Sequence, residues 1–152
     1  MKVLQVFLLT VFVSFATASE KSNWPEGSAM HAGLSQKEIL EKKQSKASEI
    51  VLKIRSNLEE HSPYKGEHLS SVFGRHNESW GDYVASTCMT VGVMTGSGGS
   101  WPSYYALTCE RNMIDRRLFN LTNTLQCIKR HVKNEQPYEL PNCLYQSFTV
   151  EY

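Results

Sequence analysis

The feature that most constrains the fold is a long helical pattern between residues 102 and 134. Apolar residues recur there at steps of three and four for about seven turns, and Arg111 is the one charged residue in the stripe. A stripe of this length predicts a helix that packs against neighbours along its whole length, with Pro102 in its first turn. The stripe consists of Leu107, Arg111, Ile114, Leu118, Leu121, Leu125, Ile128 and Val132.

Two further helical patterns precede this one. The first begins with a capping-box pattern, Ser35 followed by a Glu three residues later, and should end near His61 because Pro63 disfavours helical geometry in the residue before it. The second covers roughly residues 67–91, and a Gly- and Ser-rich turn at 95–100 separates it from the long helix. The stripe of the first helix is Ile39, Ala47, Ile50, Val51, Ile54 and Leu58, and that of the second is Leu69, Val72, Phe73, His76, Trp80, Tyr83, Val84 and Cys88.

The three patterns predict an all-α fold, a small antiparallel bundle of three main helices. Beyond Asn134 the chain turns polar and contains Pro137 and Pro141, and the alternation of its last five residues suits a short strand or an extended tail equally well. We therefore expect a single domain over residues 35–152 that ends in a tail.

Four cysteines in a small chain indicate two disulfides that staple the bundle. Cys109 and Cys127 lie about 27 Å apart along the long helix, whereas a disulfide needs Cα atoms within about 7 Å, so they cannot pair. Cys88 with Cys143 is then excluded too. Helix register favours Cys88–Cys109 and Cys127–Cys143, because Cys88 lies ten residues before Gly98 at the turn centre and Cys109 eleven after it. No pair has the short Cys-x-x-Cys spacing of zinc sites, so we predict no metal site and no cofactor.

The N-terminus has the parts of a secretory signal peptide. Lys2 precedes a short apolar run, and small residues precede the bond between Ala18 and Ser19, where we expect cleavage. The run is shorter than the ~20 apolar residues of a membrane anchor, so the cleaved chain is not expected to span a membrane. We assign residues 1–18 to the signal peptide, residues 19–34 to a flexible leader, and the mature protein to a secreted or periplasmic location.

Cleavage leaves a chain with no net formal charge. The mature protein keeps 15 of the 16 Lys and Arg residues and all 15 Asp and Glu residues. A neutral chain gives no indication of binding to nucleic acid or to an anionic membrane surface.

The sequence does not predict an enzyme, and no catalytic residue is assigned. The cysteines are expected to be oxidised, the serines lack a Gly-x-Ser-x-Gly elbow, and the histidines show no metal spacing. Glu110 and Asp115 would point about 140° apart on one helix, which does not suit a carboxylate pair. His76 lies on an apolar stripe and is expected to be a hydrogen-bonded core residue. A small exported hydrolase built on these three side chains is the least favoured function.

Other polar and aromatic residues have expected roles in structure or binding. Arg117 and Arg111 should form ion pairs within the hairpin, Arg111 with Asp82 or Glu78, because an unpaired buried charge is costly. Trp101, an aromatic beside the Gly-rich turn, is the candidate anchor for a protein partner. The expected helices also contain two glycosylation sequons, at Asn77 and Asn120.

The hairpin carries an ordered pattern of residue types. A Trp is followed by a Tyr three residues on, a Cys five beyond, a Gly-Gly-Ser turn, a second Cys, and an Arg and a Leu on the next helix; these are Trp80, Tyr83, Cys88, Gly98, Gly99, Ser100, Cys109, Arg117 and Leu121. This stretch resembles the lysozyme-inhibitor LprI-like family of small exported bacterial domains. The chain departs from the family where Val84 and Ala85 replace an Arg-Asp pair and Ile114 replaces a Thr.

The resemblance implies a helical domain that binds a protein partner, in some members a lysozyme, and blocks it by occlusion. The leading hypothesis is therefore a secreted or periplasmic protein-binding module that resembles lysozyme inhibitors. The alternative is a cell-envelope or host-directed interaction protein with the same fold and no effect on lysozyme.

Overall fold

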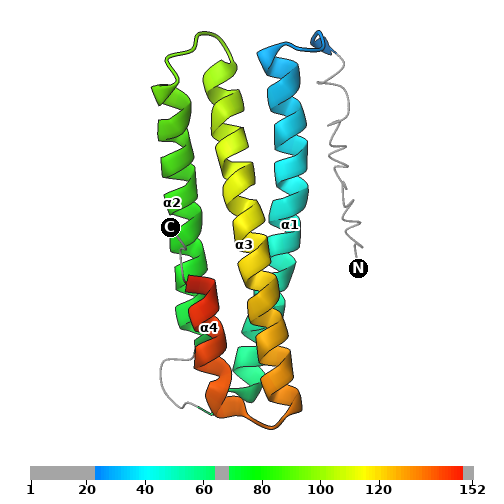
Figure 1. Cartoon of the computed structure of the whole chain (residues 1–152), viewed down its shortest axis with the longest axis vertical. Helices are drawn as coiled ribbons and strands as arrows, with labels where there is room; N and C mark the ends of the chain where they lie inside the picture. Colours follow the sequence, from blue (N-terminus) through cyan, green and yellow to red (C-terminus); the bar gives the residue numbers. More distant parts are fainter. Residues whose placement is uncertain (1–22, 64–68, 149–152) are drawn as a thin grey trace, which may run out of the picture.

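The computed structural model describes residues 23–63 and 69–148, which form a bundle of helices. Three long helices, α1 (Ala29–His61), α2 (Leu69–Met94) and α3 (Trp101–Lys133), run down, up and down the molecule (Figure 1). A short helix, α4 (Leu140–Phe148), follows the 3-10 turn η2 (Pro137–Glu139) and folds back along the lower half of the bundle. The prediction of an all-α bundle with three main helices is confirmed. The expected signal cleavage between Ala18 and Ser19 lies outside the described residues.

Helix α1 begins seven residues earlier than expected. Its N-cap is Ser28, whose hydroxyl accepts a hydrogen bond of 3.2 Å from the amide of His31. Ser35 lies inside the helix and donates its own hydroxyl to the His31 carbonyl at 2.9 Å, so it does not cap the helix. The prediction of a flexible leader is therefore wrong for residues 29–34, which form the first turns of α1, with the Ser28 hydroxyl satisfying the free amide of His31.

The core is built from one face of each helix. Helix α1 packs most extensively on α3, which lies between α1 and α2 in the upper part of Figure 1. Two expected core positions are exposed instead. Tyr83 is 58% exposed, and Ile39 is also exposed, whereas its neighbour Leu40 is buried. The largest side chains that are fully buried are Phe73, Ile54, Leu58, Leu121, Ile128 and Leu140.

The α2–α3 hairpin has the register that the cysteines predicted. The Cα atoms of Cys88 and Cys109 are 5.4 Å apart in a disulfide. Gly99 in the turn has a positive φ of 64°, a conformation that favours glycine. Next to the turn the two helices approach closely, since a Cβ at Gly92 would lie 2.5 Å from the carbonyl oxygen of Pro102. Ser100 stands at the N-cap of α3 without a capping side-chain bond.

The C-terminal region forms a helix over residues 140–148, where a tail stapled by the second disulfide was expected. Cys143 forms the second predicted disulfide with Cys127, with Cα atoms 5.6 Å apart. Leu140 and Leu144 are buried against the core, and Pro141 occupies the first turn, where its missing N–H is tolerated. The prediction of a tail is wrong for α4, because Leu140 and Leu144, one helical turn apart, are buried against the core and Cys143 is bonded to α3. The last four residues, 149–152, lie outside the described part of the chain.

The two disulfides indicate an oxidising compartment outside the reducing cytoplasm. None of the described helices is both long enough and apolar enough to cross a lipid bilayer.

Candidate functional site

Arg117, which the family pattern singled out, is a buried cation that ties three helices together. Its side chain is only 4% exposed. One guanidinium nitrogen donates to the Ser147 carbonyl of α4 at 2.7 Å and another to the Asn77 side-chain oxygen of α2 at 3.3 Å. The guanidinium also lies 5.2 Å from the ring centre of Trp80. Both of these partners are neutral, and within residues 23–63 and 69–148 Arg117 forms no ion pair, which differs from the expectation. Burial lowers the pKa of Arg117 to about 10.

The remaining motif residues do not converge on one site. Leu121 is fully buried, Tyr83 lies at the surface, and the Gly98-Gly99-Ser100 turn caps the far end of the hairpin. The motif therefore maps mainly onto the framework of the hairpin. Of the two sequon residues, Asn77 accepts a hydrogen bond from Arg117 through its side-chain oxygen. The other, Asn120, is half-buried on α3.

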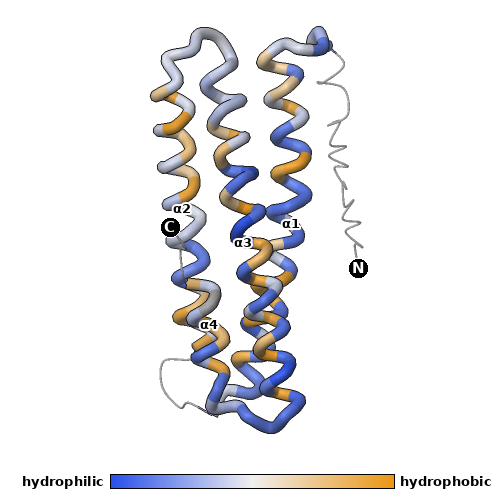
Figure 2. Tube along the Cα trace, in the orientation of Figure 1, coloured by the Kyte–Doolittle hydropathy of each residue, from blue (hydrophilic) through white to orange (hydrophobic). Residues whose placement is uncertain are grey.

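The turn end of the hairpin exposes a group of apolar side chains that we call the apolar tip. Met94, Val93 and Met89 on α2 are 79%, 71% and 68% exposed. Across the turn, Trp101 and Tyr105 are 39% and 38% exposed, and their ring centres lie 6.2 Å apart. Figure 2 shows the apolar residues gathered in the upper half of α2. The predicted partner anchor, Trp101, thus lies at the same end of the hairpin as several other exposed apolar side chains.

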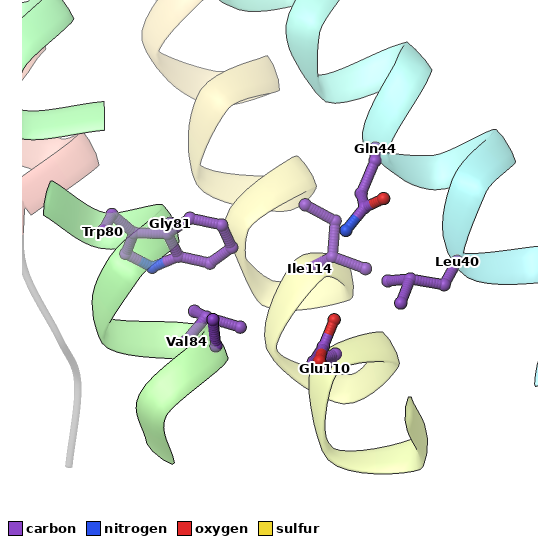
Figure 3. A pocket seen from close by; sticks show the side chains of 8 residues that line it. Leu40, Gln44, Trp80, Gly81, Val84, Glu110 and Ile114 are labelled. Carbon is purple, nitrogen blue, oxygen red and sulfur yellow. The ribbon is translucent and has the colours of Figure 1, made fainter. Parts of the chain in front are cut away.

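A pocket of about 120 Å³ opens on the side of the bundle, below the tip (Figure 3). Helix α3 forms its floor with Glu110 and Ile114, while α1 and α2 form its walls. The walls are mostly apolar, and burial raises the pKa of Glu110. Two of the three positions that depart from the family pattern, Val84 and Ala85, line one wall, and the third, Ile114, lies on the floor. The full lining is Leu40, Gln44, Trp80, Gly81, Val84, Ala85, Glu110 and Ile114.

The candidate catalytic side chains are not brought together. Asp115 points away from Glu110 and binds Lys43 through both oxygens, at 2.5 and 2.6 Å. His76 packs its ring edge-on against Phe148, with ring centres 4.3 Å apart. Its buried Nε2 has no hydrogen-bond partner in the part of the chain that the structure describes, so the expected hydrogen bond is missing at that atom. Desolvation, and then the charge of Arg117, lower the pKa of His76.

Arg111 differs from its prediction as well. Its guanidinium contacts Asn112 at 3.5 Å and, in the described part of the chain, forms no ion pair with Asp82 or Glu78. The side chain is only half-buried, so water solvates part of the charge and no carboxylate is required.

One group of metal-ligand types occurs within residues 23–63 and 69–148. The donor atoms of Cys127, His131 and Cys143 lie within 4.8 Å of one another. The two sulfur atoms are joined in a disulfide and cannot act as thiolate ligands. In the oxidised protein this group is therefore part of the α3–α4 link.

Sequence reasoning missed the pocket as a site. It considered Glu110 only as half of a carboxylate pair and did not consider Leu40, Gln44 or Gly81. A usable signal was present: Glu110 lies one turn before Ile114, a residue of the packed stripe, so its carboxylate should lie at the edge of the core.

Comparison of the chain with family models, with curated proteins and with solved structures finds no match. The resemblance to the LprI-like family therefore stays a prediction from the hairpin residues.

Proposed function

We propose that this protein is an exported binding module that acts by covering a surface of a protein partner and not by turnover. The observation that carries the proposal is the apolar tip, formed by Met89, Val93, Met94, Trp101 and Tyr105. Clustered exposed apolar side chains on a small protein are typical of interaction sites. Met and aromatic residues are also enriched in protein interfaces.

A disulfide and contacts between aromatic rings hold the apolar tip in place. The Cys88–Cys109 disulfide links the two helices about one and a half turns from Val93, so the tip is held in one arrangement before a partner arrives. A preorganised surface loses less conformational entropy on binding than a flexible one. Ring contacts among Trp101, Tyr104 and Tyr105 hold the aromatic half in place.

Lysozyme is the first partner to test, because of the resemblance to LprI-like inhibitors. Titration of oxidised protein into a lysozyme assay on bacterial cell walls should give inhibition that saturates at a fixed molar ratio. Absence of inhibition at micromolar excess would reject lysozyme as the partner. The alternative would then be a cell-envelope or host protein, to be sought by affinity capture with the same material.

The tip can be tested by replacing two exposed side chains. We expect Val93→Ser with Met94→Ser to weaken partner binding at least about tenfold, a loss typical of interface anchors. Titration calorimetry with the captured partner or lysozyme measures this loss. The matched control is Phe119→Ser on α3, which removes a side chain of 67% exposure about 27 Å from Trp101 along the helix. Unchanged binding by the double variant, or an equal loss in the control, would contradict the role of the tip.

A further inference from the structure

The side pocket combines an unpaired carboxylate with apolar walls. In the described part of the chain Glu110 forms no ion pair. Lys43, next in sequence to the lining residue Gln44, is held by both oxygens of Asp115. Figure 3 shows the Glu110 carboxylate between Val84 of α2 and Leu40 of α1. A carboxylate beside apolar walls is partly desolvated and gains from a cation placed next to it.

The lining suits a cation at the end of an alkyl chain. Leu40, Val84 and Ile114 can contact methylene groups, and the Trp80 ring adds a flat apolar surface. The Gln44 amide, which lies beside Ile114 in Figure 3, can accept a further hydrogen bond from a donor. Arg117 already lies 5.2 Å from the Trp80 ring centre, so Glu110 and not the ring supplies the main attraction for a second cation.

The pocket is open because α2 has small residues at its mouth. A Cβ added to Gly81 would meet no atom within 4 Å, and both Gly81 and Ala85 are exposed. The volume of about 120 Å³ is comparable with cavities of about 150 Å³ that hold benzene. It therefore has room for the four-carbon end of a lysine or the shorter stem of an arginine.

We propose that this pocket binds one alkylammonium or alkylguanidinium group, the end of a lysine or arginine side chain presented by the partner protein. The part played by the partner rests on the proposed function. Val84 and Val93 are about 14 Å apart along α2, so a standard interface of about 800 Å² per partner can include both the pocket and the apolar tip. The pocket would then recognise a basic residue beside the apolar contact.

The pocket is tested without a partner by titrating n-butylammonium into ¹⁵N-labelled oxidised protein. We expect saturable shifts of the Trp80 indole and Gly81 amide signals, with a dissociation constant on the order of millimolar. The neutral probe 1-butanol, of the same length, should bind at least about fivefold more weakly because it lacks the charge. Equal binding of the two probes, or no shift with either, would overturn the proposal.

Two variants test whether n-butylammonium binds beside Glu110 and behind the pocket mouth at Gly81. Glu110→Gln should weaken n-butylammonium binding at least about fivefold, whereas Glu78→Gln, an exposed carboxylate elsewhere on α2, should leave it unchanged. Gly81→Leu should abolish the shifts by filling the mouth, and its urea midpoint checks that the fold is retained. Undiminished binding by Glu110→Gln or Gly81→Leu would place the cation elsewhere and overturn the site.

The part played by the partner is measured separately. The identified partner should bind Glu110→Gln and Gly81→Leu at least about fivefold more weakly than it binds the unmodified protein. Equal binding would reject the pocket as a partner contact while leaving the binding module intact. Failure to find any partner would instead count against the proposed function, and the n-butylammonium titration would still decide whether the pocket binds a cation.

Discussion

At the scale of single residues, Arg117 shows how a charge can be buried without a carboxylate. Neutral acceptors, the Ser147 carbonyl and the Asn77 amide, bond to its guanidinium, and the Trp80 ring lies against it. These groups stabilise the cation only in part, since its Nε finds no hydrogen-bond partner among the described residues and its pKa falls to about 10. At neutral pH the group is still charged, and it raises the cost of protonating its neighbour His76.

His76 should therefore make stability depend on pH. Its pKa lies below the usual 6.5 in the folded protein, so the unfolded chain binds more protons in the range between the two values. The free energy of unfolding should fall as the pH drops below 6.5 and rise again towards neutrality. Urea unfolding at closely spaced pH values between about 5 and about 7.5, a range that includes the usual pKa of histidine, measures this slope.

The variant His76→Phe isolates this contribution. It replaces the ring without a titratable nitrogen and leaves no unpartnered Nε2, so the slope should decrease while the stability at neutral pH is retained. His131→Gln serves as the control, since this half-buried histidine lies near the end of α3 and its ring contacts the Gln136 side chain at 3.1 Å. An unchanged slope in His76→Phe would show that other groups cause the pH dependence.

At the scale of elements, the α2–α3 hairpin depends on close contact next to its turn. The missing side chain of Gly92 lets the Pro102 carbonyl and Ala106 approach α2. Backbone atoms form much of this contact, so the neighbouring helix would have to move to admit a methyl group. Gly81, on the same helix, has open space around it and no such constraint.

We expect these two glycines to respond to alanine in opposite ways. Gly92→Ala should lower the free energy of unfolding by about 1–3 kcal/mol through overpacking. Gly81→Ala should raise it by roughly 0.5–1 kcal/mol, because alanine favours the helix and meets no obstacle. Chemical unfolding with the disulfides intact measures both. Equal effects of the two substitutions would show that the close approach at Gly92 is unimportant.

At the scale of the whole molecule, the two disulfides act at opposite ends of α3. Cys88–Cys109 holds the hairpin, and Cys127–Cys143 fastens α4 to the lower part of the bundle. Helix α4 spans only nine residues, too short to be stable alone, and it carries the Ser147 carbonyl that bonds Arg117. The second disulfide therefore also maintains the partners of the buried cation.

Removing the second disulfide should loosen α4. We expect Cys127→Ala with Cys143→Ala to lower the free energy of unfolding by about 3 kcal/mol, the chain-entropy value for a closed loop near 15 residues. Hydrogen exchange should also become faster in α4 than in α1. The double variant Cys88→Ala with Cys109→Ala is the comparison, and it should leave exchange in α4 unchanged. Retained protection of α4 without its disulfide would show that packing alone holds the helix.

Local patterns were sufficient to predict much of this protein. The three long helices follow from apolar residues at three- and four-residue spacing, and the pairing of Cys88 with Cys109 follows from counting residues outward from the turn. Both depend on distances along the chain, which the sequence states directly. The same local reasoning missed Ser28 as the cap of α1 and the helix after Pro137, where the apolar signal is short.

Contacts between distant segments could not be read in this way. Tyr83 is exposed, Arg117 bonds to neutral groups of α2 and α4, and Glu110 lies in a pocket that α1, α2 and α3 form together. Which side chains meet depends on how three helices are rotated and shifted against one another. Periodicity along one helix specifies the buried face but not the residues that face it, so only the packed molecule reveals both the pocket and the surroundings of the buried cation.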